Sequence, residues 1–163
     1  MDKCKEIGCQ NYPLSFCDHC GKHATEEEIE GLLERLREIE SLTTLNLSRR
    51  DLENIEINSI SIEDFDSYIS TFKECSFHNI NFGELTEISA TSFEHCNFIN
   101  CGFNGVKIKD SFFKETNFAK CSFEETEISR VSFIEGTLLQ DCNARILNFS
   151  SVVLDESEFS CFT

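Results

Sequence analysis

The sequence has no tryptophan, one proline, one methionine and seven glycines among its 163 residues. Its 14 Lys and Arg are outnumbered by 30 Asp and Glu, so the formal net charge is −16. Such a charge disfavours direct binding to nucleic-acid phosphates or to anionic membranes. No apolar run approaches the ~20 residues of a membrane span, and the polar start does not resemble a signal peptide. We therefore expect a cytoplasmic protein that contacts no membrane and whose ten cysteines are reduced.

The sequence also lacks the short motifs of the common enzyme classes. It contains no P-loop, GxSxG or HExxH pattern and no Gly-rich dinucleotide turn. His78 and His95 have no obvious orienting partner, and the acidic residues are spread along the chain, whereas catalysis usually needs them to converge in a cleft. These features predict a protein that is not an enzyme.

An apolar residue recurs at every fifth position through the middle of the chain. A period of five fits neither an α-helix nor a simple strand, so it indicates an internal repeat. The central residues of the pentads are Ile88, Phe93, Phe98, Phe103, Ile108, Phe113, Phe118, Phe123, Ile128, Phe133 and Leu138.

The isoleucines recur every twenty residues, which predicts that four pentads form one four-sided coil and that coils stack about 4.8 Å apart. The repeat extends over 42–163, with one extra residue after Phe82 and another after Leu138. Ser67 interrupts the phase, so the surrounding run EDFDSYIS is expected to bulge or loop out of the wall.

A second column supports this register. Two residues before each centre the chain prefers small or apolar groups, which we also expect to point inward. The five cysteines in this column are interpreted as buried small side chains: Cys75, Cys96, Cys101, Cys121 and Cys142. Cys161 lies outside the column and is predicted to be exposed.

Pentads such as CNFIN, CGFNG, TNFAK and CSFEE resemble those of pentapeptide repeat proteins in their Phe-centred form. The resemblance covers about three quarters of the chain and implies an all-β solenoid, a right-handed quadrilateral β-helix. It also implies that the chain can be a non-catalytic scaffold, or an acidic mimic of DNA that binds a type II topoisomerase such as gyrase and protects or inhibits it. A fold by itself does not decide between these functions.

The first 24 residues contain four cysteines and two histidines. Cys4-x4-Cys9 followed by Cys17-x2-Cys20 is typical of a tetrahedral Zn²⁺ site, and metal binding would fold a segment too short for its own core. We predict one structural zinc ion in a knuckle over 1–24, with these four cysteines as ligands and His19 or His23 as substitutes. The run PLSFCDHC also resembles the middle of B-box and AN1-type zinc fingers.

Residues 25–41 are predicted to form an amphipathic helix. Thr25 and Glu28 form a capping-box pattern, and an apolar face follows from Ile29 to Ile39. The helix is expected to cap the open end of the solenoid, because an uncovered first coil exposes unpaired strand edges. A dimerising helix is the alternative.

Outward positions of the repeat suggest where a protein partner binds. One predicted column of acidic residues contains Glu74, Glu115 and Glu135, a second contains Asp64, Glu84 and Glu125, and an apolar strip contains Ile99 and Leu139. Such acidic columns are either solvated surface or the contact for a basic partner.

Two hypotheses follow. The first is an acidic interaction scaffold that carries zinc, and the second is the topoisomerase-binding DNA mimic. A homodimer through the C-terminal coil is also expected, because Phe159 and Phe162 end the chain with little to cover them.

Overall fold

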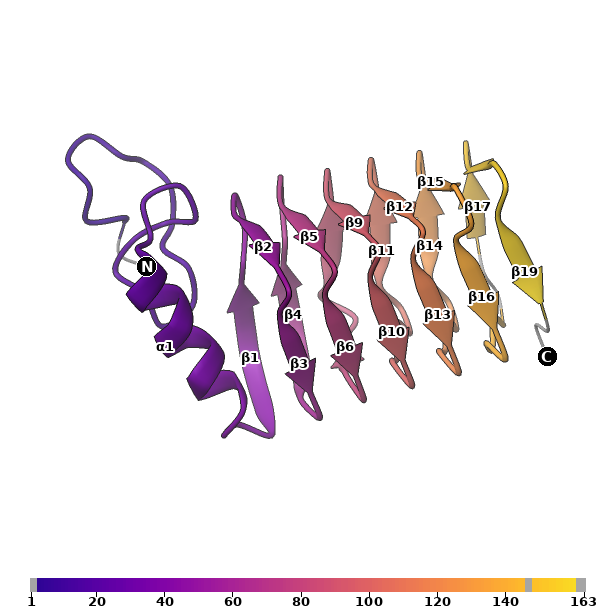
Figure 1. Ribbon diagram of the computed structural model, residues 1–163, viewed down its shortest axis with the longest axis horizontal. Coiled ribbons are helices and arrows are strands. Elements are labelled where there is room, and N and C mark those ends of the chain that lie inside the picture. The colour runs from indigo at the N-terminus through magenta and orange to yellow at the C-terminus, as the bar shows by residue number, and fades with distance from the viewer. Residues whose placement is uncertain (1–2, 146–147, 161–163) are drawn as a thin grey trace.

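The computed structural model describes residues 3–145 and 148–160. The described chain forms a parallel β-helix preceded by an irregular segment and the helix α1 (Glu26–Leu36). The irregular segment and α1 lie at one end of the stacked coils, and β19 (Glu158–Ser160) lies at the other (Figure 1). No helix in the described ranges is long and apolar enough to cross a membrane.

Three walls of the solenoid are parallel sheets to which successive coils contribute strands in order. Sheet A contains β1 (Ser41–Asn46), β4 (Ser61–Asp66), β8 (Glu87–Ser89), β11 (Lys107–Lys109), β14 (Glu127–Ser129) and β17 (Asn148–Ser150), with β7 (Asn81–Phe82) paired to β4. Sheet B contains β2 (Asp51–Glu53), β5 (Thr71–Lys73), β9 (Ser92–Glu94), β12 (Phe112–Lys114), β15 (Ser132–Ile134) and β18 (Val153–Leu154). Sheet C contains β3 (Glu56–Asn58), β6 (Ser76–His78), β10 (Asn97–Ile99), β13 (Asn117–Ala119), β16 (Leu138–Gln140) and β19 (Glu158–Ser160). The fourth wall is joined by single bridges through Asn81, Gly102, Ser122 and Asn143. The predicted quadrilateral coil is confirmed.

The interior is filled by ladders of like side chains, because parallel strands in register place each centre above the equivalent residue of the coil before. Three ladders are built of phenylalanine and the fourth of isoleucine. Behind sheet B the rings stack at centroid spacings of 5.0, 5.0 and 5.1 Å. The ladders are Phe72–Phe93–Phe113–Phe133, Phe77–Phe98–Phe118, Phe82–Phe103–Phe123 and Ile88–Ile108–Ile128. Neighbouring ladders meet edge to face, which is a favourable arrangement for aromatic rings.

The corners of the coils are occupied by residues with left-handed backbone conformation. At most corners the residue two positions after a centre is not glycine, and its φ lies between 47° for Glu115 and 63° for Arg49; Asp64 and Glu84 are exceptions. A left-handed conformation costs most side chains roughly 1–2 kcal/mol. The stacked coils compensate, because corner N–H groups donate to the next coil, as from Glu74 to the carbonyl oxygen of Glu94 at 2.9 Å.

Helix α1 covers the first coil. The predicted capping box is present, with the Glu28 N–H donating to the Thr25 hydroxyl at 3.2 Å and the Thr25 N–H donating to the Glu28 carboxylate at 3.0 Å. Ile29, Leu32 and Leu36 are buried in the same core as the solenoid interior. The helix is shorter than the predicted 25–41 range because β1 already begins at Ser41. Its apolar face is used within the chain, as a cap requires.

The predicted register is wrong by one residue at the fifth coil. Leu139, which was expected to be exposed, lies above Phe118 and is only 2% exposed. Leu138, predicted as the inward centre, instead lies on the outward side of β16 next to Asn117. The extra residue of this coil therefore lies before β16 and not after it, at the corner of Glu135 and Gly136, where both residues have positive φ.

The predicted bulge around Ser67 is also wrong. β4 is one continuous strand from Ser61 to Asp66 that pairs with β1, and Ser67 is fully buried in the centre column. The large side chain has moved two residues earlier, because Phe65 is buried next to it and its ring lies 5.3 Å from that of Phe82. A large and a small inward residue have exchanged places, so the wall keeps its interior volume.

Candidate metal centre

The segment before α1 folds on itself through main-chain hydrogen bonds. Cys4 donates to the carbonyl oxygen of Asn11 at 2.9 Å, and Leu14 donates to that of His19 at 2.9 Å. Lys5 connects the two ends of the loop by donating to the carbonyl oxygen of Asp18 at 3.1 Å. These bonds bring the first cysteine pair next to Cys20. We refer to residues 3–24 as the knuckle.

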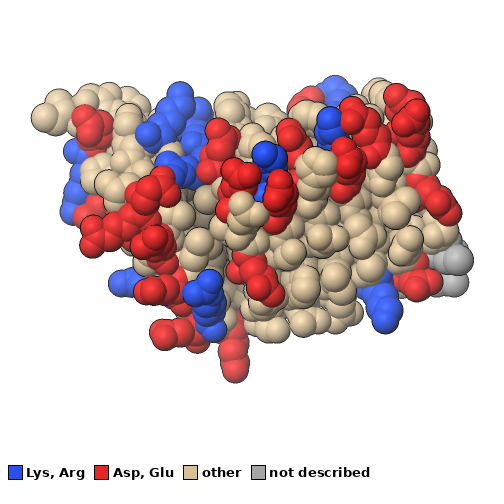
Figure 2. Space-filling model, in the orientation of Figure 1, with Lys and Arg blue, Asp and Glu red and all other residues tan. Residues whose placement is uncertain are grey.

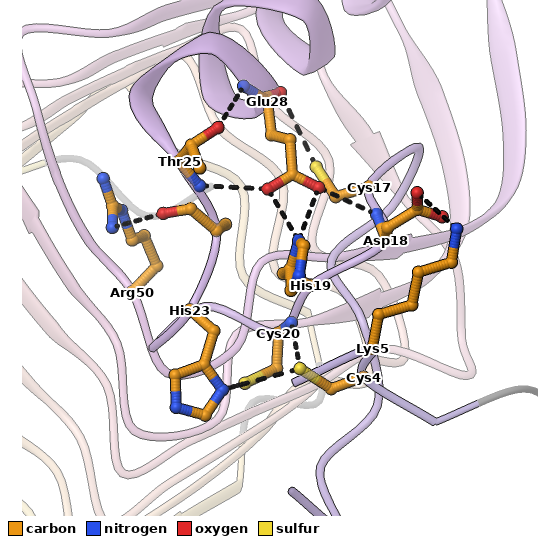
Figure 3. Close-up of polar contacts among 11 residues, drawn as sticks. Cys4, Lys5, Cys17, Asp18, His19, Cys20, His23, Thr25, Glu28 and Arg50 are labelled. Carbon is orange, nitrogen blue, oxygen red and sulfur yellow. Dashed lines mark hydrogen bonds and ion pairs between the residues drawn. The ribbon is translucent and has the colours of Figure 1, made fainter. Parts of the chain in front are cut away.

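Four ligand atoms converge inside the knuckle. The thiols of Cys4, Cys9 and Cys20 and a ring nitrogen of His23 all lie within 4.8 Å of one another. The His23 Nδ1 is 3.5 Å from both the Cys4 and the Cys20 Sγ, and the Cys9 and Cys20 Sγ atoms are 3.8 Å apart. Figure 3 shows His23 pointing toward Cys4 and Cys20 below the first turn of α1. The arrangement is a Cys3His set that can hold a metal ion.

The spacing of these atoms fits a tetrahedral ion. With Zn–S bonds of about 2.3 Å and a Zn–N bond of about 2.0–2.1 Å, tetrahedral ligands lie about 3.8 Å apart for two sulfurs and about 3.6 Å apart for sulfur and nitrogen. The observed separations of 3.8 and 3.5 Å match these edges. Three soft thiols with one imidazole also match the donor preference of zinc.

The local electrostatics favour one thiolate and oppose several. Burial acts to raise the pKa of Cys4, but the N–H groups of Cys20 and Glu6 and the ring of His23 outweigh it and lower that pKa to about 6. The Asn11 N–H acts to lower the pKa of Cys9, yet burial and the neighbouring thiols of Cys20 and Cys4 leave it raised. Thiols this close repel one another when ionised, and a bound cation removes that repulsion.

Cys17 and His19 lie outside the cluster, although we predicted Cys17 as a ligand. The Cys17 Sγ donates to the main-chain oxygen of Glu28 at 3.6 Å, and burial together with the Glu28 carboxylate raises its pKa to about 11. The His19 Nδ1 is 3.1 Å from each Glu28 carboxylate oxygen. The capping carboxylate also accepts the Asp18 N–H at 3.0 Å, so it binds the Cys17–His19 turn to the helix (Figure 3).

The sequence offered only a weak signal that His23, and not Cys17, is the fourth ligand of the cluster. Cys17 and His23 are both three positions from Cys20, so both spacings suit a metal ligand. What separates them is the helix that begins after Thr25. Glu28 in its first turn forms hydrogen bonds with Cys17 and His19, and His23 is left facing the other thiols.

The knuckle is joined to the first coil by packing and hydrogen bonds. Leu14 is buried in the core shared with the solenoid. Ser15 donates its N–H to the carbonyl oxygen of Asn46 at 3.0 Å, and its hydroxyl accepts the Asn46 N–H at 2.8 Å. Gly21 lies so close to the turn after β1 that a Cβ there would clash with the main-chain oxygen of Ser48. The fold of the knuckle and the cap on the solenoid are therefore coupled.

Two carboxylates of the first acidic column each have a nitrogen-bearing side chain next to them. Glu74, Glu115 and Glu135 are exposed corner residues. The His95 ring lies 3.2 Å from the Glu115 carboxylate, and the Lys114 ammonium lies 2.7 Å from that of Glu135. Figure 2 shows acidic and basic groups interspersed along this edge of the solenoid, over β2, β5, β9 and β12.

The second acidic column is less regular than predicted. Glu84 and Glu125 are exposed, and the space between them is taken by Gly105 of the intervening coil. Asp64 is half-buried within the continuous strand β4 and does not lie at a corner. It therefore faces a different environment from the other two carboxylates.

The apolar strip is shorter than predicted. His78, Ile99 and Ala119 are in register on the outside of sheet C, and each is half-buried. The next position is Gln140, because Leu139 points inward. Figure 2 shows few charges over β6, β10 and β13, where this strip lies.

The solenoid cysteines are buried, as predicted, and they act as hydrogen-bond donors. Each donates to a centre-residue carbonyl of the preceding coil, as Cys96 does to Phe72 at 3.3 Å. Thr116 makes the equivalent bond to Phe93 at 3.1 Å. The same role is filled by Cys75, Cys101, Cys121 and Cys142. Cys161 lies outside the described residues.

One family model matches part of the repeat region. Residues 96–133 match the family model for pentapeptide repeats in eight copies. The solenoid of this chain is a pentapeptide-repeat β-helix, and the Phe-centred resemblance found in the sequence is confirmed. No curated protein matches the chain.

Three solved structures resemble the chain at low identity. The pentapeptide repeat protein Rfr23 from the cyanobacterium Cyanothece 51142 has 9% identity and a TM-score of 0.32, with 81% of this chain and 99% of that chain covered. A putative glycosyl hydrolase from Parabacteroides merdae has 11% identity and a TM-score of 0.33, with coverages of 85% and 93%. QnrB1, a plasmid-mediated fluoroquinolone resistance protein, has 14% identity and a TM-score of 0.28, with coverages of 75% and 92%. Likenesses this distant say nothing about function.

Proposed function

We propose that this chain is a non-catalytic protein-interaction scaffold, in which a zinc ion stabilises the knuckle that caps a rigid acidic β-helix. The observation that carries the proposal is the Cys3His set, whose separations fit tetrahedral zinc. The ion would fold a segment whose Leu14 belongs to the solenoid core. A reducing compartment such as the cytoplasm would keep these thiols available.

The scaffold acts through preorganisation. Stacked ladders hold outward side chains in rows at the spacing of paired strands, about 4.8 Å. A protein partner that meets such rows pays little entropy to order them. The chain offers exposed carboxylates with interspersed cations, a pattern suited to a partner surface with charges of both signs rather than to nucleic acid.

Metal analysis tests the zinc part of this proposal. Freshly purified, unchelated protein is expected to contain about one zinc per chain. Removal of the ion with a strong chelator should make residues 3–24 sensitive to limited proteolysis, while the strands of the middle coils stay protected. A zinc content below about half an ion per chain would contradict the proposal.

The DNA-mimic alternative has less support. It requires continuous acidic columns, whereas His95 interrupts the first column beside Glu115 and Lys114 pairs with Glu135. It also favours projecting loops, and β4 is continuous where a loop was expected near Ser67. We therefore rank binding to a topoisomerase below the scaffold function.

We also propose that a second copy of the chain covers the C-terminal coil. β17, β18 and β19 are the last described strands of the three sheets, and within residues 3–145 and 148–160 no strand pairs with their outer edges. Phe149 and Leu154 are in register with the buried centres Ile128 and Phe133, yet they are 48% and 55% exposed because no further described coil lies over them. Pairing of two such ends around a two-fold axis would cover these edges. Phe162 lies outside the described residues.

Replacement of Leu154 with lysine tests this pairing. The wild-type protein is expected to have the mass of a dimer by size-exclusion chromatography with light scattering, and Leu154→Lys that of a monomer, because a charge opposes burial of the end. Leu85→Lys is the matched control, since Leu85 is 73% exposed at a corner of the third coil. A monomeric wild type, or a dimer unaffected by Leu154→Lys, would rule out this interface.

A further inference from the structure

A hollow of about 380 Å³ lies where the knuckle meets the first coils, on the outer side of sheet A. The knuckle supplies Tyr12 to its wall, β4 and the corner after it supply half of the rest, and β1 and β8 supply the remainder. The residues that matter for its chemistry are Tyr12, Asp64, Asp66, Tyr68 and Glu87.

The hollow arises from the departure of the first two coils from the repeat. β1 and β4 run for six residues each across a position where the later coils make a tight turn, as at Asn104 and Gly105. In β4 the exchange of Phe65 and Ser67 turns Phe65 into the core. The wall is therefore flat at β1 and β4, with the knuckle on one side and β8 on the other.

Two carboxylates on the wall of the hollow have no cationic partner. Asp64 and Asp66 lie on the outer side of β4, on either side of the buried Phe65. Asp66 accepts hydrogen bonds from the Ser48 hydroxyl at 2.5 Å and from the Tyr68 N–H at 3.1 Å. Within residues 3–145 and 148–160, neither aspartate forms an ion pair. Burial, together with the Asp66 carboxylate, raises the pKa of Asp64.

The only two tyrosines of the chain border the same hollow. Both rings are half exposed, and both already contact cations of the chain. The Lys3 ammonium lies 3.7 Å from the centre of the Tyr12 ring, and the Arg49 guanidinium lies 5.3 Å from that of Tyr68. An aromatic ring attracts a cation through its negative face. The contacts of Lys3 and Arg49 show that the rings at this rim attract cations.

We propose that this hollow binds a lysine or arginine side chain of a protein partner. The cation would lie against the tyrosine rings and neutralise Asp64 and Asp66, while its aliphatic stem covers apolar surface next to Phe65. This inference rests on the scaffold function and specifies the chemistry of its partner. A divalent metal fits less well, because the carboxylates of the hollow do not converge as the knuckle ligands do among the described residues.

The tyrosines provide the readout. Because the chain has two tyrosines and no tryptophan, tyrosine fluorescence reports on this hollow alone. The probe is a Gly/Ser peptide that carries three lysines and no aromatic residue, compared with the same peptide in which every lysine is acetylated. The lysine peptide is expected to change the fluorescence saturably, and the acetylated peptide to have no effect.

Substitutions distinguish binding of the peptide in this hollow from general attraction to the acidic surface. Asp64→Asn keeps the shape of a side chain that has no hydrogen bond to any described residue, and it should weaken peptide binding about tenfold. Tyr68→Leu, followed through Tyr12, should weaken it about fivefold. The control is Glu127→Gln, an equal loss of charge on β14 of the same sheet, with an expected effect of less than about twofold.

Three outcomes would overturn the inference. They are equal binding of the acetylated peptide, equal weakening by Glu127→Gln and Asp64→Asn, and saturation by calcium chloride without any response to the lysine peptide. Zinc content is measured on the same samples. If the protein contains zinc but does not bind the lysine peptide, this inference alone is wrong. If the protein contains no zinc, the proposed function is contradicted.

Discussion

Replacing Cys20 with serine is expected to abolish metal binding and to unfold the knuckle, while Cys17→Ser leaves both intact. Cys20 is buried, and its thiol lies next to both Cys9 and His23. Metal binding supplies on the order of 10 kcal/mol to the folding of small zinc segments, and a three-ligand remnant keeps little of it. Cys17 instead donates to Glu28, so its loss removes one weak hydrogen bond.

The two variants form a matched pair, because they make the same substitution in the same CxxC run. Zinc content should fall from about one per chain to nearly none in Cys20→Ser and stay near one in Cys17→Ser. Limited proteolysis should cut the knuckle only in the first variant. The opposite result, with zinc lost from Cys17→Ser and kept in Cys20→Ser, would restore the four-cysteine site predicted from the sequence.

Phe98→Ala is expected to lower the free energy of unfolding by about 3–5 kcal/mol, which is the usual cost of a buried Phe→Ala cavity. The ring stacks on Phe77 at 4.6 Å and on Phe118 at 4.9 Å. It also meets Phe93 and Phe103 edge to face. Its loss therefore opens a cavity in the middle of the solenoid, where four rings lose a neighbour.

Phe112→Ala is the matched control, since Phe112 is 38% exposed on the outside of β12. Its expected cost is below about 1 kcal/mol. Urea unfolding followed by far-ultraviolet circular dichroism measures both. Equal destabilisation by the two variants would show that the ladder contributes no more than surface packing. A similar slope with urea in all proteins would confirm that the same surface is exposed on unfolding.

The sequence predicted the fold well where one residue type marks the inward side. From Ile88 to Phe133 each centre is buried in the predicted ladder. The register failed at Leu138 and Leu139, because two adjacent leucines satisfy the pattern equally. The column two residues before each centre would have decided between them. Thr137 lies two positions before Leu139, and its hydroxyl makes the same kind of hydrogen bond as that of Thr116.

Other features depend on contacts between segments that a repeat pattern does not contain. The exchange of Phe65 and Ser67 conserves the combined volume of two inward positions. A pattern based on the centres alone shows only that Ser67 is not apolar, and it does not show that Phe65 takes its place. In the knuckle, the spacing to Cys20 is the same for Cys17 and His23. The choice between these two is made by Glu28 of α1, which holds the turn of Cys17 and His19.

The left-handed corners limit how short this protein can be. Residues such as Glu74, His95 and Glu115 adopt positive φ without being glycine, and each costs roughly 1–2 kcal/mol. Only contact with adjoining turns of the spiral repays that penalty, and a terminal turn has just one neighbour. When successive turns are removed, we thus expect a minimum length below which the remaining turns unfold as one unit instead of fraying gradually.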